Sequence, residues 1–257
     1  MVVIPPLNII KENNFHRAWY KAVNYILHHG VELKLGSREK QEIILDSTIC
    51  IELTGSAVRQ IINRELHPDF PFKQVEEYCK TFTYEYLEQY LNQDDDSRFK
   101  YIYMDRLANY PATFSSNKFI HEESINQLSL MRLFLYHQIK ENFTSNRCQA
   151  ISWIPYIDSD SKAAPCKINP PDSPCLQRIQ LRHIGDGNID VHISFRSHDC
   201  YRAWQVNLIA IVTMLNRYVL DSSRYKLIRI VEFNDSLHIY NRDKSDAKRV
   251  KPIPDYI

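Results

Sequence analysis

The sequence predicts an α+β fold for this chain of 257 residues. Helical and strand-like stretches alternate along its length without an internal repeat or a clear linker, so we expect one domain spanning residues 1–257. Hydrophobic residues make up 44% and charged residues 25% of the chain, which is ordinary for a globular protein. Only five glycines occur, without GxGxxG or P-loop spacing, which disfavours a dinucleotide-binding fold.

In the first half, apolar residues recur at helical spacing over residues 14–29, and Gly30 follows as a natural stop. The β-branched run at residues 43–53 predicts a strand. Helical periodicity returns over residues 73–91. The acidic run at residues 93–98 predicts an exposed loop, with a cation site as the less favoured reading.

In the second half, helical periodicity predicts two long helices, over residues 122–142 and 199–219. The proline-rich stretch at residues 158–174 predicts a loop. A glycine-containing turn at residues 183–188 indicates a hairpin between the strands on either side of it. Short apolar, β-branched or alternating runs predict the strands, at residues 148–154, 175–182, 188–195, 227–233 and 237–240.

Charge and composition exclude several classes of function. The formal net charge of +1 gives no global basic field for nucleic acid, and no apolar run of about 18 residues is present to span a membrane. The N-terminus is a poor signal peptide. The six cysteines form no CxxC pair and no metal-ligand spacing, so we expect free thiols, no bound metal and a cytoplasmic protein.

Cys175 is the candidate nucleophile. It follows the proline-rich loop and opens a predicted strand, which would fix a thiol at the edge of a cleft. A thiolate adds to an electron-poor carbon when a nearby cation lowers its pKa. The alternative is a small core residue, and Cys166, which also follows a proline, meets the same sequence test.

Arg196, Ser197 and Asp199 lie together where a predicted strand ends and a helix begins. An arginine and a serine at such a junction can bind an anion, whereas Ser197 or Asp199 can equally act as an N-cap. Asn207 follows Asp199 by eight residues on the same predicted helix, about two turns, so both can face one pocket. Its side-chain amide both donates and accepts, which suits the edge of a base.

His238 and Tyr240 alternate along a predicted strand, so their side chains share one face. Both can hydrogen-bond a sugar hydroxyl. The alternative is a half-buried strand with one polar face.

Taken in order, proline-cysteine, Arg-Ser-x-Asp, an asparagine eight residues later and His-x-Tyr resemble the thymidylate synthase family. The resemblance is best from Arg147 to Tyr240 and is traceable from Asn14 to Pro111. It points to the shorter branch found in archaea and phages, which includes the hydroxymethylases of dUMP and dCMP. It implies a mixed β-sheet flanked by helices, with one sheet face forming a homodimer interface.

The resemblance implies roles for the residues already singled out. Cys175 matches the nucleophile that adds to C6 of the base. Arg196 and Ser197 match phosphate-binding positions, with Arg196 also near the thiol. Asp199 matches the aspartate that orders the site and contacts the folate. Asn207 matches the asparagine that reads the O4/N3 edge of the pyrimidine.

Further positions follow from the same resemblance. His238 and Tyr240 match the pair at the deoxyribose 3′-hydroxyl. Arg147 matches one of two adjacent arginines that reach the partner subunit's phosphate site, although Asn146 stands where the other would be. Arg38 resembles the arginine of the N-terminal phosphate loop.

Two further residues are expected to move protons. Tyr103 resembles the tyrosine placed for proton removal at C5. Glu85 is the best match to the glutamate that organises water and protonates the base, with Glu76 and Glu77 as the other candidates.

The chain departs from the family on the side of the carbon donor. Leu176 follows the cysteine where the family has histidine, and no tryptophan lies between Glu85 and Tyr103. The sequence ends roughly where the family's closing tail begins. The departures leave the one-carbon donor open, between 5,10-methylenetetrahydrofolate and a related reduced pterin.

The resemblance therefore implies C5 methylation of dUMP to dTMP in a homodimer, with Arg147 contributed in trans. Asn207 favours uracil, because relatives specific for cytosine carry an acidic residue there. The alternatives are 5-hydroxymethylation of dUMP or dCMP, and a nucleotide-binding relative without catalysis.

Overall fold

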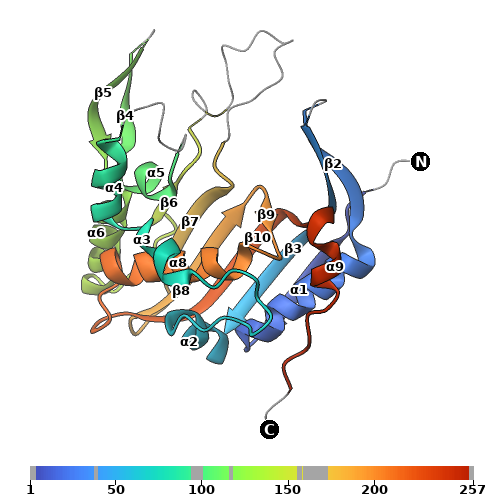
Figure 1. The fold of residues 1–257 in the computed structure, drawn as a ribbon. Coiled ribbons are helices and arrows are strands. Elements are labelled where there is room, and N and C mark those ends of the chain that lie inside the picture. Colours follow the sequence, from blue (N-terminus) through green and yellow to red (C-terminus); the bar gives the residue numbers. More distant parts are fainter. Residues whose placement is uncertain are drawn as a thin grey trace.

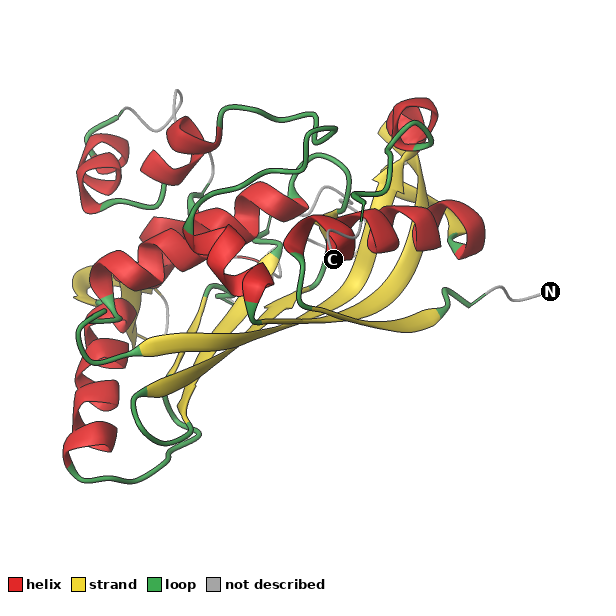
Figure 2. Cartoon of the chain, turned by 90° about the horizontal axis from the view of Figure 1, so that it is seen from below, coloured by secondary structure: helices red, strands yellow, loops and turns green. Residues whose placement is uncertain are grey.

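The structure is a computed structural model that describes residues 4–37, 40–93, 101–115, 118–154, 158 and 173–254. One large mixed β-sheet runs through the molecule, and most helices lie on one of its faces (Figures 1 and 2). A separate hairpin consists of β4 (Tyr110–Ser115) and β5 (Lys118–Ile125). The α+β class and the mixed sheet flanked by helices are confirmed.

The strands of the large sheet lie in the order β1-β3-β10-β8-β7-β6. Parallel pairs join β1 to β3 and β10 to β8, and antiparallel pairs join the rest of this series. β2 pairs with the first part of β3, and β9 pairs with β10. The strands are β1 (Leu7–Glu12), β2 (Val31–Ser37), β3 (Lys40–Thr54), β6 (Gln149–Ile151), β7 (Leu176–His183), β8 (Asn188–Phe195), β9 (His198–Asp199) and β10 (Lys226–Tyr240).

Two long helices cover the sheet. α1 (Phe15–His29) presents the predicted apolar stripe inward, and the Asn14 side chain caps its N-terminus by accepting from the amide of Arg17. α8 (Trp204–Tyr218) is buried along most of its length, including Asn207. The shorter helices are α2 (Ser56–Ile62), α3 (Val75–Lys80), α4 (Tyr84–Leu91), α5 (Tyr103–Ala108), α6 (Gln127–Lys140), η1 (Asn241–Asp243) and α9 (Lys244–Ala247).

Two helices are shorter in the structure than the sequence predicts. The helix expected over residues 73–91 is broken between α3 and α4, because Thr83 is extended and its hydroxyl caps α4 by accepting from the amide of Tyr86. The helix expected over residues 122–142 begins only at Gln127, because the preceding residues pair in β5. Periodicity alone did not detect these local competitors.

The region after β8 also differs from the prediction. Asp199 lies in β9 rather than on α8, which begins at Trp204, so Asp199 and Asn207 do not share a helix. The two predicted strands at residues 227–240 are one strand, β10, with an irregularity between Asn234 and Leu237. The predicted hairpin β7–β8 is confirmed.

The face of the sheet away from α1 and α8 carries a row of side chains in register, Ile9, Cys50 and Phe233, on three adjacent strands. Ile9 is 60% and Phe233 45% exposed. Large apolar side chains on an open sheet face are typical of an interface. Within the described part of the chain, no helix is both long enough and apolar enough to cross a membrane.

Candidate functional site

Cys175 and Arg196 lie together at the junction before β7. The backbone amide of Arg196 donates to the carbonyl of Cys175 at 2.9 Å. The guanidinium donates from Nε to Pro174 O at 3.0 Å and from Nη2 to Ser173 O at 2.6 Å. A guanidinium presents its donors in a fixed fork, so Arg196 holds the segment that carries the partly buried thiol.

Three tyrosines surround this thiol. The Tyr101 hydroxyl hydrogen-bonds the backbone of Cys175 and the side chain of Tyr103. The amide of Leu176 donates to the Tyr103 hydroxyl at 3.4 Å. Burial raises the pKa of Tyr101 to about 12 and that of Tyr103 well above its usual value, and the nearby Cys175 raises both further. Both phenols therefore stay protonated at neutral pH.

Tyr78 lies near the thiol and binds Asn207. Burial is the largest cause of the raised pKa of Tyr78, and Cys175 contributes to it. The Tyr78 hydroxyl donates to Asn207 Oδ1. The sequence patterns did not indicate Tyr78 or Tyr101 as site residues. Tyr78 falls within the helical periodicity of residues 73–91, and Tyr101 precedes Tyr103 by two residues without a motif of its own.

The Asn207 side chain also contacts buried polar groups that the sequence patterns did not indicate. Its Nδ2 lies 2.8 Å from His198 Nε2, and His198 Nδ1 lies 3.1 Å from Glu232 Oε1. His198 is 3% exposed and Glu232 is fully buried. His198 lay inside the predicted Arg-Ser-x-Asp motif, and Glu232 lay in a predicted strand, where a buried charge gives no sequence signal.

His238 and Tyr240 share one face of β10, as predicted. Their rings meet edge to face, with centroids 4.9 Å apart. His238 is buried, and its Nε2 has no hydrogen-bond partner within the described part of the chain. Burial lowers the pKa of His238 to about 4, so this imidazole is neutral at pH 7. An unpartnered buried nitrogen beside a tyrosine is suited to bind a ligand hydroxyl.

Asp199 pairs in register with His238, because β9 lies beside β10. Its Oδ1 accepts from the amides of Tyr201 at 2.9 Å and Arg202 at 3.0 Å. Burial raises the pKa of this carboxyl. Asp199 thus caps a turn and is fixed within the site, while Ser197 is half-buried in the bend between β8 and β9.

The structure does not bring the predicted glutamates to Cys175. Glu85 has a side chain 66% exposed and pairs with Arg217 at 2.9 Å. Arg217 follows Asn207 by ten residues on α8, a separation of about 15 Å. Glu76 pairs with Arg64 and Glu77 with Lys80, and both glutamate side chains are largely exposed.

Of the two remaining arginines, Arg147 is not part of the cluster within its own chain. Arg38 lies outside the described residues. Arg147 is exposed before β6, and the next residue, Cys148, accepts from the amide of Leu181. Leu181 is six residues along β7 from Cys175, so Arg147 lies about 20 Å from the thiol.

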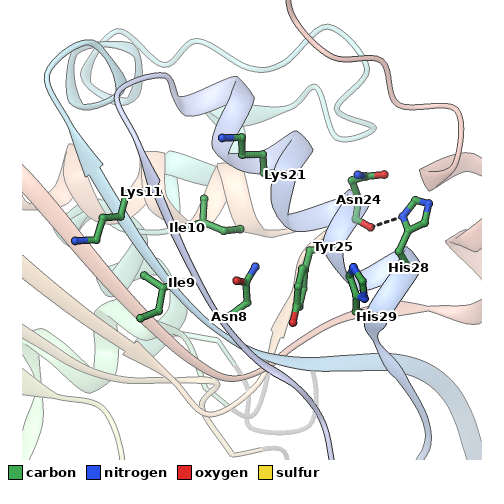
Figure 3. Close-up of a pocket in the computed structure, with 9 residues that line it drawn as sticks. All are labelled: Asn8, Ile9, Ile10, Lys11, Lys21, Asn24, Tyr25, His28 and His29. Atoms are coloured by element: carbon green, nitrogen blue, oxygen red, sulfur yellow. Dashed lines mark hydrogen bonds between the residues drawn. The ribbon is translucent and has the colours of Figure 1, made fainter.

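A separate pocket of about 1030 Å³ lies between β1 and α1, at the sheet edge opposite β6 (Figure 3). Its polar lining includes Lys11, Lys21 and His28, and none of the predicted site residues. No group of His, Cys, Asp and Glu suited to a metal ion occurs among the residues that the structure describes. The cluster around Cys175 is therefore the candidate site on chemical grounds.

Known proteins resemble this chain over most of its length. The chain is 26% identical over 239 residues to a protein named "Putative thymidylate synthase" in Methanosarcina barkeri, which covers 91% of this chain and 90% of the relative. A protein of the same name in Methanococcoides burtonii is 25% identical over 246 residues, covering 94% of each chain. The chain is thymidylate synthase-like. No protein-family model matches the sequence, so the thymidylate synthase-like assignment rests on these full-length relatives.

Proposed function

We propose that this thymidylate synthase-like chain is an enzyme that alkylates C5 of dUMP, giving dTMP, through a covalent bond between Cys175 and C6 of the base. The convergence of Cys175, Arg196 and Asn207 on one site carries this proposal. Tyr78 binds the asparagine and lies near the thiol, and Arg196 fixes the segment that bears the thiol. The names of the relatives favour the same substrate class.

In the proposed reaction, the Cys175 thiolate attacks C6, and the electron pair of the C5–C6 bond moves toward O4. The Asn207 amide and the positive charge of Arg196 stabilise the negative charge as it develops. His238 and Tyr240 receive the 3′-hydroxyl, and Arg196 and Ser197, together with Arg38, receive the phosphate. Expulsion of Cys175 later restores the aromatic base.

The protonation state of Tyr103 determines its role in the proposed reaction. Its raised pKa keeps the phenol protonated, so we assign it to relay the C5 proton through water rather than to act as a phenolate base. Glu85 remains our candidate for organising that water. Because Glu85 pairs with Arg217 at the surface, this role requires α4 to move toward the site when substrate binds.

A bound reduced pterin, 5,10-methylenetetrahydrofolate or a relative of it, would supply the one-carbon unit and, for a methyl product, the hydride that reduces it. Asp199 fits such a group, because a carboxyl fixed by two backbone amides can accept hydrogen bonds from pterin nitrogens. Hydroxymethylation is the second candidate, since no tryptophan lies between Glu85 and Tyr103 to keep water from an exocyclic intermediate.

We also propose that the site is completed by a second copy of the chain. The exposed row Ile9, Cys50 and Phe233 offers an apolar face for self-association. Arg147 lies too far from its own Cys175 to serve that site, and this fits a role across a dimer interface.

Product analysis tests the proposed reaction. Incubation with dUMP and methylenetetrahydrofolate should give a nucleotide that has gained a methyl group, measured by mass spectrometry. A hydroxymethyl product would select the second candidate. Unaltered dUMP, under conditions where binding is demonstrated, would refute methylation, and unaltered dCMP in the same assay would refute hydroxymethylation as well.

A further inference from the structure

A chain of hydrogen bonds begins at the side-chain amide of Asn207, and the proposed reaction assigns it no role. It runs from Asn207 Nδ2 to His198 Nε2, 2.8 Å apart, and from His198 Nδ1 to Glu232 Oε1 and Asn234 Oδ1, each 3.1 Å away. All four side chains are at most 6% exposed. Buried away from water, each donor here needs an acceptor within the chain.

Two fixed groups determine the direction of these bonds. The carbonyl of Ile49 accepts from Asn234 Nδ2 at 3.4 Å, which turns Asn234 Oδ1 toward His198. The Trp204 indole, which can only donate, binds Glu232 Oε2 and leaves Oε1 for His198. Two acceptors therefore face His198 Nδ1. The ring hydrogen belongs on Nδ1, and Nε2 is left as an acceptor.

This tautomer in turn fixes the amide of Asn207. With Nε2 accepting, the amide must present its NH₂ to His198 and its oxygen to the hydroxyl of Tyr78. Rotating the amide by half a turn would set its oxygen against the lone pair of Nε2. Phe195 stacks on the imidazole with centroids 3.9 Å apart, which holds the plane of the His198 ring.

We propose that His198 and Glu232 are positioning residues that make the site select uracil over cytosine, an inference that rests on the proposed function. Uracil donates at N3 and accepts at O4, whereas cytosine accepts at N3 and donates at N4. One amide orientation of Asn207 matches uracil, and the reversed orientation matches cytosine. His198 and Glu232 act through Asn207 and do not contact the nucleotide.

The isosteric substitution Glu232→Gln tests this inference. Trp204 would bind the new amide oxygen, so the new NH₂ would face His198 Nδ1 and leave Asn234 Oδ1 as the one acceptor there among the described residues. The equilibrium would shift toward the tautomer with hydrogen on Nε2. The Asn207 amide would then satisfy its hydrogen bonds in the reversed orientation, with its oxygen toward His198 Nε2. We expect the ratio of dCMP to dUMP dissociation constants, measured by calorimetry, to fall by about tenfold to hundredfold.

A matched control is Glu12→Gln. Glu12 is also buried, but it pairs with Arg17 and Lys21 beside α1, away from the chain of bonds. We expect this variant to keep the wild-type ratio. Trp204→Phe is a second test variant, because it removes the donor that orients Glu232 but leaves its charge. It should lower the ratio by a smaller factor.

Nitrogen NMR of the His198 ring in the nucleotide-free protein gives a readout that is independent of activity. We expect hydrogen on Nδ1 in the wild type and a shift toward Nε2 in Glu232→Gln. Hydrogen on Nε2 in the wild type, or an unchanged nucleotide ratio despite a reversed tautomer, would overturn the inference alone. Wild-type protein that binds neither nucleotide would overturn the proposed function and this inference together.

Discussion

Arg196 and Cys175 are joined through their backbones as well as by position, since the amide of Arg196 donates to the carbonyl of Cys175 at 2.9 Å. The side chain of Arg196 then binds the two carbonyls that precede the cysteine. One residue thus fixes the geometry of the thiol and also places a positive charge beside it. A substitution that keeps the charge but loses the fork separates these two contributions.

Arg196→Lys should therefore lower kcat/KM for dUMP by roughly a hundredfold, because misplacement of a nucleophile by about 1 Å has such an effect. A lysine keeps the charge but cannot reach both Ser173 O and Pro174 O in one geometry. Arg224→Lys is the control, since Arg224 pairs with Asp221 at the surface. Equal activity of the two variants would show that the fork is unnecessary.

The free energy of unfolding should fall at acid pH because of His238. Burial lowers its pKa in the folded state to about 4, from 6.5. The unfolded chain therefore binds a proton first as the pH falls. The stabilising contribution is complete above pH about 6.5 and is lost toward pH about 4, by about 3 kcal/mol in total.

Urea unfolding at a series of pH values measures this effect. His16 and His67 also have pKa values lowered by burial, so the contribution of His238 is the difference between the wild type and His238→Asn. A difference that does not change between pH 7 and pH 4 would contradict the assignment.

Asn207→Asp should shift the preference of the enzyme from dUMP toward dCMP. A carboxylate accepts from the N4 amino group of cytosine but cannot donate to O4 of uracil. The ratio of kcat/KM values should change by about tenfold or more. Asn24→Asp, on α1 beside the separate pocket, is the control. The assigned role of Asn207 fails if both variants keep the wild-type ratio.

Complementation between two inactive variants tests whether a second copy of the chain contributes to the site. Cys175→Ser and Arg147→Ala should each abolish or strongly reduce activity, and a mixture of the two should regain part of it through dimers with one intact site. Phe233→Asp should give a monomer in gel filtration, whereas Leu91→Asp, equally exposed at the end of α4, should not. An active wild-type monomer would contradict the role of Arg147 in trans.

Local sequence patterns predicted the elements that depend on near neighbours. The residues that form the stripe and caps of α1 are close together in the sequence, and so are those of the glycine turn between β7 and β8. Periodicity and turn chemistry therefore suffice to predict both elements. The break at Thr83 was missed, because its capping hydroxyl competes with a helical pattern that continues on both sides.

Short local motifs, and the order in which they follow one another, indicated Cys175, Arg196 and Asn207 as candidates, and their roles stay predictions. The partners of Asn207 and His198 that are distant in sequence were missed. Tyr78 meets Asn207 across 129 positions, and Glu232 meets His198 across 34, and neither separation leaves a pattern in the sequence. Only the assembled sheet and helices bring these groups together.

The covalent adduct with 5-fluoro-dUMP tests the central claim most directly. Fluorine at C5 cannot leave as a proton does, so the bond from Cys175 to C6 should persist in the presence of methylenetetrahydrofolate. Mass spectrometry of the digested protein should find the nucleotide on the peptide that contains Cys175, and Cys175→Ser should abolish it while Cys166→Ser, at the other cysteine that follows a proline, does not. An unmodified Cys175, in protein shown to bind the nucleotide, would contradict the account.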